Sequence, residues 1–121
     1  MPPTIVKYYR DNVDSVPPLI DWLEALPPKA RTKCLAGLTR LESEGHDLRR
    51  PAADYLRDGI YGLRVGLQGV NYRLLYFFHG REAVVVSHGL TKEREVPPRE
   101  IDLAIQRKAR LETDPRRHSF P

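Results

Sequence analysis

The residue types best suited to chemistry lie in the segment 58–100, where cationic side chains recur inside apolar runs. Arg64 and Arg73 are nine positions apart in two successive runs, and His88 lies in a third. A purely structural strand does not require these arginines. Because arginine guanidinium groups bind phosphate oxygens in bidentate geometry, the spacing points to an anionic ligand.

Glycine-containing turns divide this segment into three β-prone runs, at residues 60–67, 70–78 and 82–89. Short gaps with glycine between apolar runs are typical of β-hairpins. If Gln68 and Gly69 form the first tip, Arg64 lies directly opposite Arg73. Opposed side chains have Cβ atoms about 4.5–5.5 Å apart, where like charges repel. An anion between the two arginines would remove this cost.

The register of the second hairpin decides where His88 lies. A tip at residues 80–81 places His88 opposite Arg73. A tip at residues 79–80 places Val86 there instead and leaves His88 on the diagonal. Either register puts both arginines and His88 on one face, whereas a one-residue slip would separate them.

Further residues around these positions favour a binding site. Lys92 and Arg94 follow the third run, and Gly62 and Gly66 flank Arg64 on its face. The glycines would leave room for a ligand. A purely structural alternative is equally compatible with the spacing, namely arginines that are solvated or paired with carboxylates such as those of Glu82 or Glu93.

The apolar residues of these runs predict a sheet covered on both sides. Leu63, Val65, Leu74 and Tyr76 are expected to share one face, whereas Leu75, Phe77, Val84 and Val86 are expected to share the face of the arginines. Tyr61, Tyr72 and Tyr76 are candidates for stacking on bases, although a core position is the better interpretation of Tyr76. Arg49, Arg50 and Arg57 form a possible basic rim beside the sheet, or a solvated surface.

The remaining segments predict a strand and three helices. Residues 4–10 are expected to form a first strand. Apolar residues at helical spacing follow Pro17-Pro18 and Pro27-Pro28, which predicts two helices in a hairpin, with Gly45 as the C-cap of the second. Cys34 lies on the apolar stripe and is expected to be buried and inert. A final helix is expected from residue 97 to about residue 111, followed by a flexible tail at residues 113–121.

Composition bounds the class of protein. The 121 residues are expected to form a single domain with a modest core. The net charge of +4 is compatible with nucleic acid or an acidic partner. The single cysteine cannot form an internal disulfide, and no signal peptide or long apolar span is evident, so a cytoplasmic protein without membrane contact is expected. The residues lack zinc-ligand spacing, a nucleotide-binding glycine loop and an acidic pair for a metal-dependent nuclease, so neither metal nor cofactor is expected.

Several of these motifs occur together in a known order. The chain carries Leu63-Arg64, then Tyr72-Arg73, then His88-Gly89, with Lys92 shortly after and a proline pair before the last helix. Over residues 8–111 it resembles the RelE/HigB-type toxins of the RelE/ParE superfamily, and most closely their phage-derived, HigB-like branch. This sequence departs from the usual pattern at three positions: Leu90 replaces an aromatic residue, Glu93 replaces the second lysine, and Gly62 replaces an acidic residue.

The resemblance implies an α+β, RelE-like fold with an N-terminal strand, a helical hairpin, an antiparallel meander sheet and a C-terminal helix. It also implies the toxin component of a type II toxin–antitoxin module, a metal-independent endoribonuclease that cleaves mRNA on the ribosome. In such a reaction the ribose 2′-OH attacks the adjacent phosphate and leaves a 2′,3′-cyclic phosphate.

The resemblance assigns roles to residues of this sequence. Arg64 and Arg73 would hold the phosphate, and His88 or Lys92 would act as the base. The RNA-binding residues would be Tyr72, Arg94, Arg57 and Arg49.

The partners implied are a cognate antitoxin, mRNA on the ribosome, and operator DNA through the antitoxin complex alone. Two alternatives stay open. One is a ParE-type protein that poisons DNA gyrase, and the other is a catalytically degenerate toxin that only binds its antitoxin.

Overall fold

A computed structural model describes residues 4–81, 83–91 and 95–121. Its elements, in chain order, are β1 (Ile5–Tyr9), α1 (Pro18–Glu24), α2 (Pro28–Glu44), a 3₁₀ turn η1 (Gly45–Asp47), β2 (Ala53–Arg57), β3 (Ile60–Leu67), β4 (Val70–His79), β5 (Ala83–Thr91), α3 (Pro98–Thr113), α4 (Pro115–His118) and β6 (Ser119–Phe120). The strands form one six-stranded sheet in the order β2-β3-β4-β5-β1-β6, in which β1 and β5 are the parallel pair. The α+β, RelE-like expectation is confirmed.

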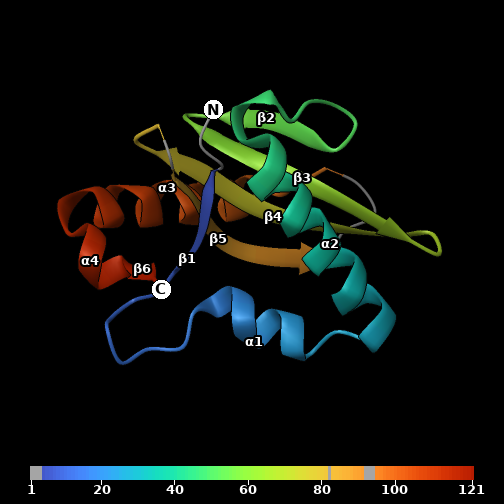
Figure 1. Cartoon of the computed structure of the whole chain (residues 1–121), viewed down its shortest axis with the longest axis horizontal. Coiled ribbons are helices and arrows are strands. Elements are labelled where there is room, and N and C mark those ends of the chain that lie inside the picture. Colours follow the sequence, from blue (N-terminus) through green and yellow to red (C-terminus); the bar gives the residue numbers. More distant parts are fainter. Residues whose placement is uncertain (1–3, 82, 92–94) are drawn as a thin grey trace.

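Helices cover both faces of this sheet (Figure 1). The α1–α2 hairpin packs on one face, over a core that includes Leu63, Leu74 and Tyr76. Helix α3 packs on the other face against Leu75 and Phe77. We call these the hairpin face and the α3 face.

The two helices of the hairpin begin at prolines, as the sequence predicts. Gly45 adopts positive φ where α2 ends, which confirms the predicted C-cap. Cys34 is fully buried, as expected, and burial raises the pKa of its thiol to about 11. The adjacent Leu35 is exposed.

The β3–β4 hairpin has the predicted register. Gln68 and Gly69 both have positive φ, as a two-residue hairpin turn requires, and Arg64 pairs with Arg73. Asp58 and Gly59 form a turn with the same signs of φ between β2 and β3. The Asp-Gly signal therefore marked a preceding strand, β2, that the sequence analysis missed.

The register predicted for the β4–β5 hairpin is wrong in both of its forms. Arg73 pairs with Leu90, and His88 pairs with Leu75. Two shifts cause the difference. At the turn, His79 pairs with Ala83, so the loop is longer than the predicted two residues. A β-bulge then adds a second shift, since Tyr76 pairs with Val86 and the adjacent Leu75 pairs with His88, so that one extra residue lies in β5. The turn places Val84 and Val86 opposite Phe78 and Tyr76, in the hairpin-face core and not on the arginine side, where Val85 lies; the bulge beyond Val86 then returns His88 to the arginine side.

The C-terminal residues 113–121 were expected to form a flexible tail. They instead form α4 and β6, and β6 pairs with β1 through Tyr8 and Tyr9. The Arg10 guanidinium donates hydrogen bonds to the carbonyls of Arg116 and Arg117. These long-range bonds hold the end of the chain against the first strand.

Gly89 is the position at which α1 approaches the sheet most closely. A Cβ built there would lie 2.3 Å from Cε3 of Trp22, a separation that real structures do not tolerate. We predict that Gly89→Ala lowers the free energy of unfolding by about 1–3 kcal/mol, because an overpacked site must shift rigid aromatic and backbone atoms. Urea unfolding followed by circular dichroism measures this.

Gly66→Ala is the matched control, because Gly66 also lies in a strand and its nearest heavy atom to a built Cβ is 3.7 Å away. Its unfolding free energy should stay within about 0.5 kcal/mol of the wild type. Equal stability of the two variants would contradict the close packing of Trp22 on Gly89.

Candidate functional site: an arginine cluster on the α3 face

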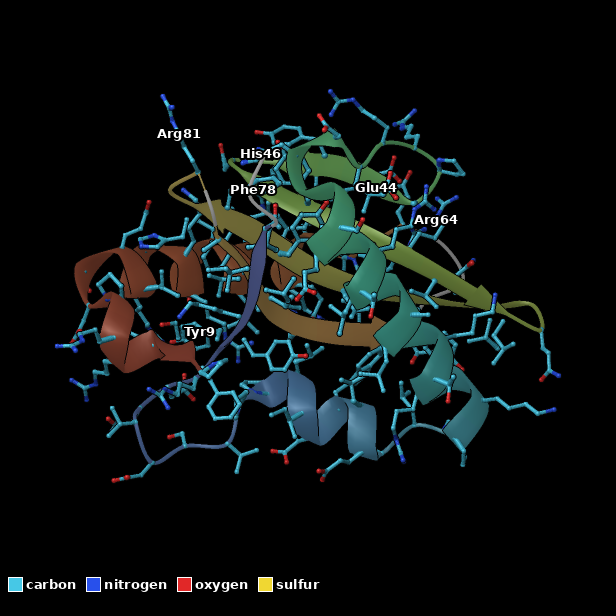
Figure 2. All side chains as sticks on the ribbon, viewed as in Figure 1. Tyr9, Glu44, His46, Arg64, Phe78 and Arg81 are labelled. Carbon is cyan, nitrogen blue, oxygen red and sulfur yellow. The ribbon has the colours of Figure 1, made fainter. Side chains whose placement is uncertain are left out.

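The predicted pair of arginines lies on the α3 face, because Arg73 alternates along β4 with Tyr72 and Leu74 of the hairpin-face core. Arg64 is 43% exposed at its side chain, whereas Arg73, directly opposite, is only 8% exposed. Figure 2 shows Arg64 far from the β4–β5 turn that carries Arg81. The pair is therefore half open, with one guanidinium at the surface and one beneath it.

Arg73 is in an unfavourable environment for a cation. Within the described part of the chain its buried Nε has no hydrogen-bond partner. Burial, followed by the nearby charge of Arg64, lowers the pKa of Arg73. A buried charge normally needs a partner, so an anion at this point would relieve both costs.

A third arginine and a carboxylate complete the cluster. Asp54 Oδ1 accepts from Arg50 Nε at 2.6 Å, and Asp54 Oδ2 lies 3.8 Å from Arg64. The described partner of Arg64 is Asp54. The two carboxylates considered from the sequence, Glu82 and Glu93, lie outside the described residues. We call Arg50, Arg64 and Arg73 the arginine cluster. Its three positive charges face the single carboxylate of Asp54 among the described contacts.

Asp54 was not among the candidate residues predicted from the sequence, because it belongs to β2, a strand that was not predicted. It pairs with Gly62, which puts it beside Arg64 on the α3 face. The Asp-Gly turn at residues 58–59, with Tyr55 and Leu56 before it, was the signal that could have found this strand.

His88 shares the α3 face with the arginines, as expected, but both of its ring nitrogens are engaged. Nδ1 lies 2.8 Å from the Ser87 hydroxyl, and Nε2 lies 3.0 Å from Oε1 of Glu100 in α3. A neutral imidazole satisfies both contacts by donating from Nε2 to Glu100 and accepting at Nδ1 from Ser87. His88 therefore joins α3 to the sheet, and it could accept a proton from a substrate only if one of these bonds opened.

Arg107 extends this network toward the other end of α3. It donates to the carbonyl of Ser87 at 3.1 Å and to the Ser87 hydroxyl at 3.3 Å, and its guanidinium lies over the ring of Tyr9. Burial, followed by the charge of Arg107, lowers the pKa of His88, and Glu100 partly opposes this shift. We call Ser87, His88, Glu100 and Arg107 the His88 network.

The order Ser87, His88, Glu100 has the connectivity of a hydrolase triad, but the accessibility excludes that role. The Ser87 side chain is fully buried and already bonded to Arg107, so no substrate can reach its oxygen. Ser87 is therefore not a nucleophile, and the contacts of this network join α3 to β5.

The structure separates Tyr72 from the catalytic candidates. Its ring lies on the hairpin face, 7% exposed, in edge contact with Trp22 at 6.2 Å between centroids. Successive strand residues point to opposite faces, so Tyr72 cannot share a ligand with Arg73 on the α3 face. The structure thus places Tyr72 and the arginines on different faces, and the RNA-binding role of Tyr72 stays a prediction.

The remaining predicted RNA-binding residues are dispersed. Arg57 pairs with Asp58 at 3.2 Å and with Asp102 of α3, which ties the β2–β3 turn to that helix. Arg49 is exposed and donates to the carbonyl of His46 at 2.9 Å. Its neighbour Arg50, and not Arg49, joins the arginine cluster.

Two of the candidates, Lys92 and Arg94, lie outside the described residues. In the described ranges no group of three or more histidine, cysteine, aspartate or glutamate side chains is placed to hold a metal ion. No described helix is both long and apolar enough to cross a membrane.

The position of His88 generates a test of pH dependence. The pKa of His88 is lower in the folded protein than in the unfolded chain. Between these two pKa values the unfolded chain therefore binds a proton that the folded protein does not bind. We predict that the unfolding free energy falls as the pH drops from about 6.5 toward the native pKa of His88. This loss should be smaller in His88→Gln, and chemical denaturation at a series of pH values measures it.

Glu100→Gln provides the matched variant. The carboxylate of Glu100 favours the protonated imidazole, so its removal should lower the pKa of His88 further in a titration of the ring protons by NMR. A pKa that rises in this variant would contradict the His88–Glu100 contact.

Comparison with known proteins supplies a family. The family described as phage-derived protein Gp49-like (DUF891) matches residues 21–109, from α1 through most of α3. This family is associated with RelE and toxin-like proteins. A search of curated proteins found no match. Because the family match covers well over half of its residues, the chain belongs to the Gp49-like family of phage-derived proteins.

Proposed function

We propose that this protein is the toxin of a type II toxin–antitoxin module and acts as a metal-independent endoribonuclease on mRNA at the ribosome. The observation that carries the proposal is the opposed pair Arg64 and Arg73, one exposed and one buried with an Nε that has no hydrogen-bond partner among the described residues. A folded protein gains nothing from this repulsion unless an anion binds there. The toxin-like family to which the chain belongs supports the toxin role.

The scissile phosphate would be held between the two guanidinium groups. Arg64 would meet it from the solvent side and Arg73 from below, where low dielectric strengthens the interaction. As the 2′-OH attacks, negative charge grows on the equatorial phosphate oxygens, and prepositioned arginines stabilise that charge more than they stabilise the ground state. The products would be a 2′,3′-cyclic phosphate and a free 5′-hydroxyl.

The proton transfers need a base and an acid. His88 and Lys92 are the two candidates for the base. His88 would first have to release Ser87 or Glu100, since both ring nitrogens are bonded. Nearby cations would lower the pKa of a lysine and favour its neutral form. His88 would otherwise contribute by holding α3 against the sheet behind Arg73.

The other expected partners belong to the same proposal. A cognate antitoxin would neutralise the toxin with an acidic or helical segment over the arginine cluster, and operator DNA would be bound only through that complex. The protein would act in the cytoplasm on translating ribosomes.

Arg73→Met is the decisive variant. Methionine keeps much of the apolar stem and removes the charge, so RNA cleavage should fall by about 10²–10³-fold. The unfolding free energy should stay unchanged or rise, because an apolar group replaces a buried charge that has no partner in the described part of the chain. Inducible expression in a bacterium, with mapping of new 5′ ends in mRNA, measures cleavage, and urea unfolding measures stability.

Arg81→Met is the control, because Arg81 is exposed in the β4–β5 turn, away from Arg64. It should cleave RNA like the wild type.

Undiminished cleavage by Arg73→Met would contradict the assignment of Arg73 to the phosphate site. Growth arrest without mRNA cuts, but with gyrase-linked DNA breaks, would favour the ParE-type action. No arrest by the wild type would favour a degenerate toxin that only binds its antitoxin.

Asp54→Asn should act in the opposite direction. It removes the carboxylate that, among the described residues, contacts Arg50 and Arg64, so a short single-stranded RNA should bind about twofold to fivefold more tightly at low salt. Fluorescence anisotropy measures the affinity, and the gain should shrink as salt is added. Weaker binding by this variant would show that Asp54 holds Arg64 in place more than it neutralises it.

A further inference from the structure

A hollow of about 570 Å³ lies on the hairpin face, between the start of α2 and the β3–β4 turn. Its lining consists of Pro27, Pro28, Lys29, Ala30, Leu67, Gln68, Val70 and Tyr72. A second hollow of about 390 Å³ shares Pro28, Lys29 and Leu67 and continues along α2 past Thr32 and Lys33. The two form one groove, which we call the α2 groove.

The floor of the α2 groove is aliphatic. Leu67 and Val70 are the last residue of β3 and the first of β4, and both remain half-buried against the hairpin-face core. Tyr72 closes the groove, with most of its ring covered by the protein. Burying the remaining apolar surface would favour an occupant with aliphatic side chains.

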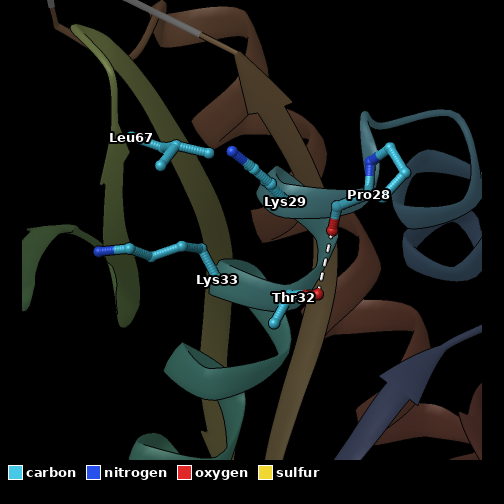
Figure 3. Close-up of a pocket in the computed structure, with 5 residues that line it drawn as sticks. All are labelled: Pro28, Lys29, Thr32, Lys33 and Leu67. Atoms are coloured by element: carbon cyan, nitrogen blue, oxygen red, sulfur yellow. Dashed lines mark hydrogen bonds between the residues drawn. The ribbon is translucent and has the colours of Figure 1, made fainter.

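The rim of the α2 groove is positive. Figure 3 shows the side chains of Lys29 and Lys33 extending from α2 toward the strand that carries Leu67. None of the residues that line the groove is acidic. The first turn of α2 adds to this charge, because it contains no acidic residue and no side chain caps it.

The α2 groove is separate from the arginine cluster. Tyr72 lies at the groove and Arg73 lies in the cluster, and adjacent strand residues point to opposite faces of the sheet. An occupant of the groove would leave the cluster open to RNA.

We infer that the α2 groove binds a peptide segment of a partner protein in which acidic residues alternate with aliphatic ones. The aliphatic side chains fill the floor over Leu67 and Val70, and the carboxylates meet Lys29 and Lys33. A nucleic acid fits less well, because the floor is aliphatic and the one aromatic ring there, Tyr72, is covered.

The test begins with a displayed library of random 12-residue peptides selected against the full chain. The enriched peptides are expected to carry Asp or Glu together with Leu, Ile or Val. A synthetic winner is then titrated while the fluorescence of Trp22 is recorded. Trp22 is the only tryptophan, and its ring is 6.2 Å from that of Tyr72 at the groove.

Charge reversal locates the binding. In Lys29→Glu/Lys33→Glu the affinity for the winning peptide should fall roughly tenfold or more. The control is Arg81→Glu/Arg116→Glu, which changes the net charge equally at exposed positions in the β4–β5 turn and α4. This control should bind like the wild type.

Four results would overturn the inference. The selection could enrich no peptide, or it could enrich basic peptides. The two double variants could lose affinity for the peptide equally, or a single-stranded RNA could displace the bound peptide. Dimerisation through the groove, abolished by the Lys29/Lys33 reversal, would assign the surface to a second copy of the chain. Arg73→Met should bind the peptide like the wild type, so failure of the proposed nuclease activity leaves this test intact.

Discussion

The rest of the molecule depends on one turn, the pair Gln68 and Gly69 between β3 and β4. Positive φ at both positions makes a tight two-residue hairpin, and the tight hairpin leaves one register. That register places Arg64 opposite Arg73 and, on the other face, aligns Leu63 with Leu74 in the core under α2. A slip of one residue would exchange these faces, exposing the core and burying both charges. The fold and the candidate site are therefore consequences of the same turn.

The β-bulge in β5 is the second feature that determines which side chains lie on each face of the sheet. It lets Val84 and Val86 face the helical hairpin, while His88 and Leu90 face α3 a few residues later. Without the extra residue, one end of β5 would place its side chains on the wrong face. The bulge also places Ser87 where Arg107 can bond both its carbonyl and its hydroxyl. Bulges often redirect side chains near functional sites, and this one directs His88 toward Glu100.

The two faces of the sheet carry different kinds of surface. The α3 face ends in guanidinium groups that are poorly compensated, which suits a small, highly charged anion. The hairpin face ends in an aliphatic groove with a positive rim, which suits a larger amphipathic segment. This division explains why Tyr72 and Arg73, adjacent in sequence, take no part in a common site.

Local sequence determined much of this protein. Proline pairs marked the starts of α1, α2 and α3, apolar spacing predicted which helical positions are buried, and a two-residue turn determined that Arg64 and Arg73 oppose each other. Such features depend on interactions between residues close in the chain, so pattern and propensity suffice.

Only the tertiary structure decided which remote side chains meet at the candidate site and at the chain end. The burial of Arg73, the engagement of His88 by Glu100, the contact of Asp54 with the arginines and the docking of the C-terminal residues on β1 all join segments that are remote in sequence. The sequence contains every one of these residues, but a bulge of one residue or an overlooked edge strand changes which of them meet. Long-range packing sets those meetings, and no local pattern encodes it.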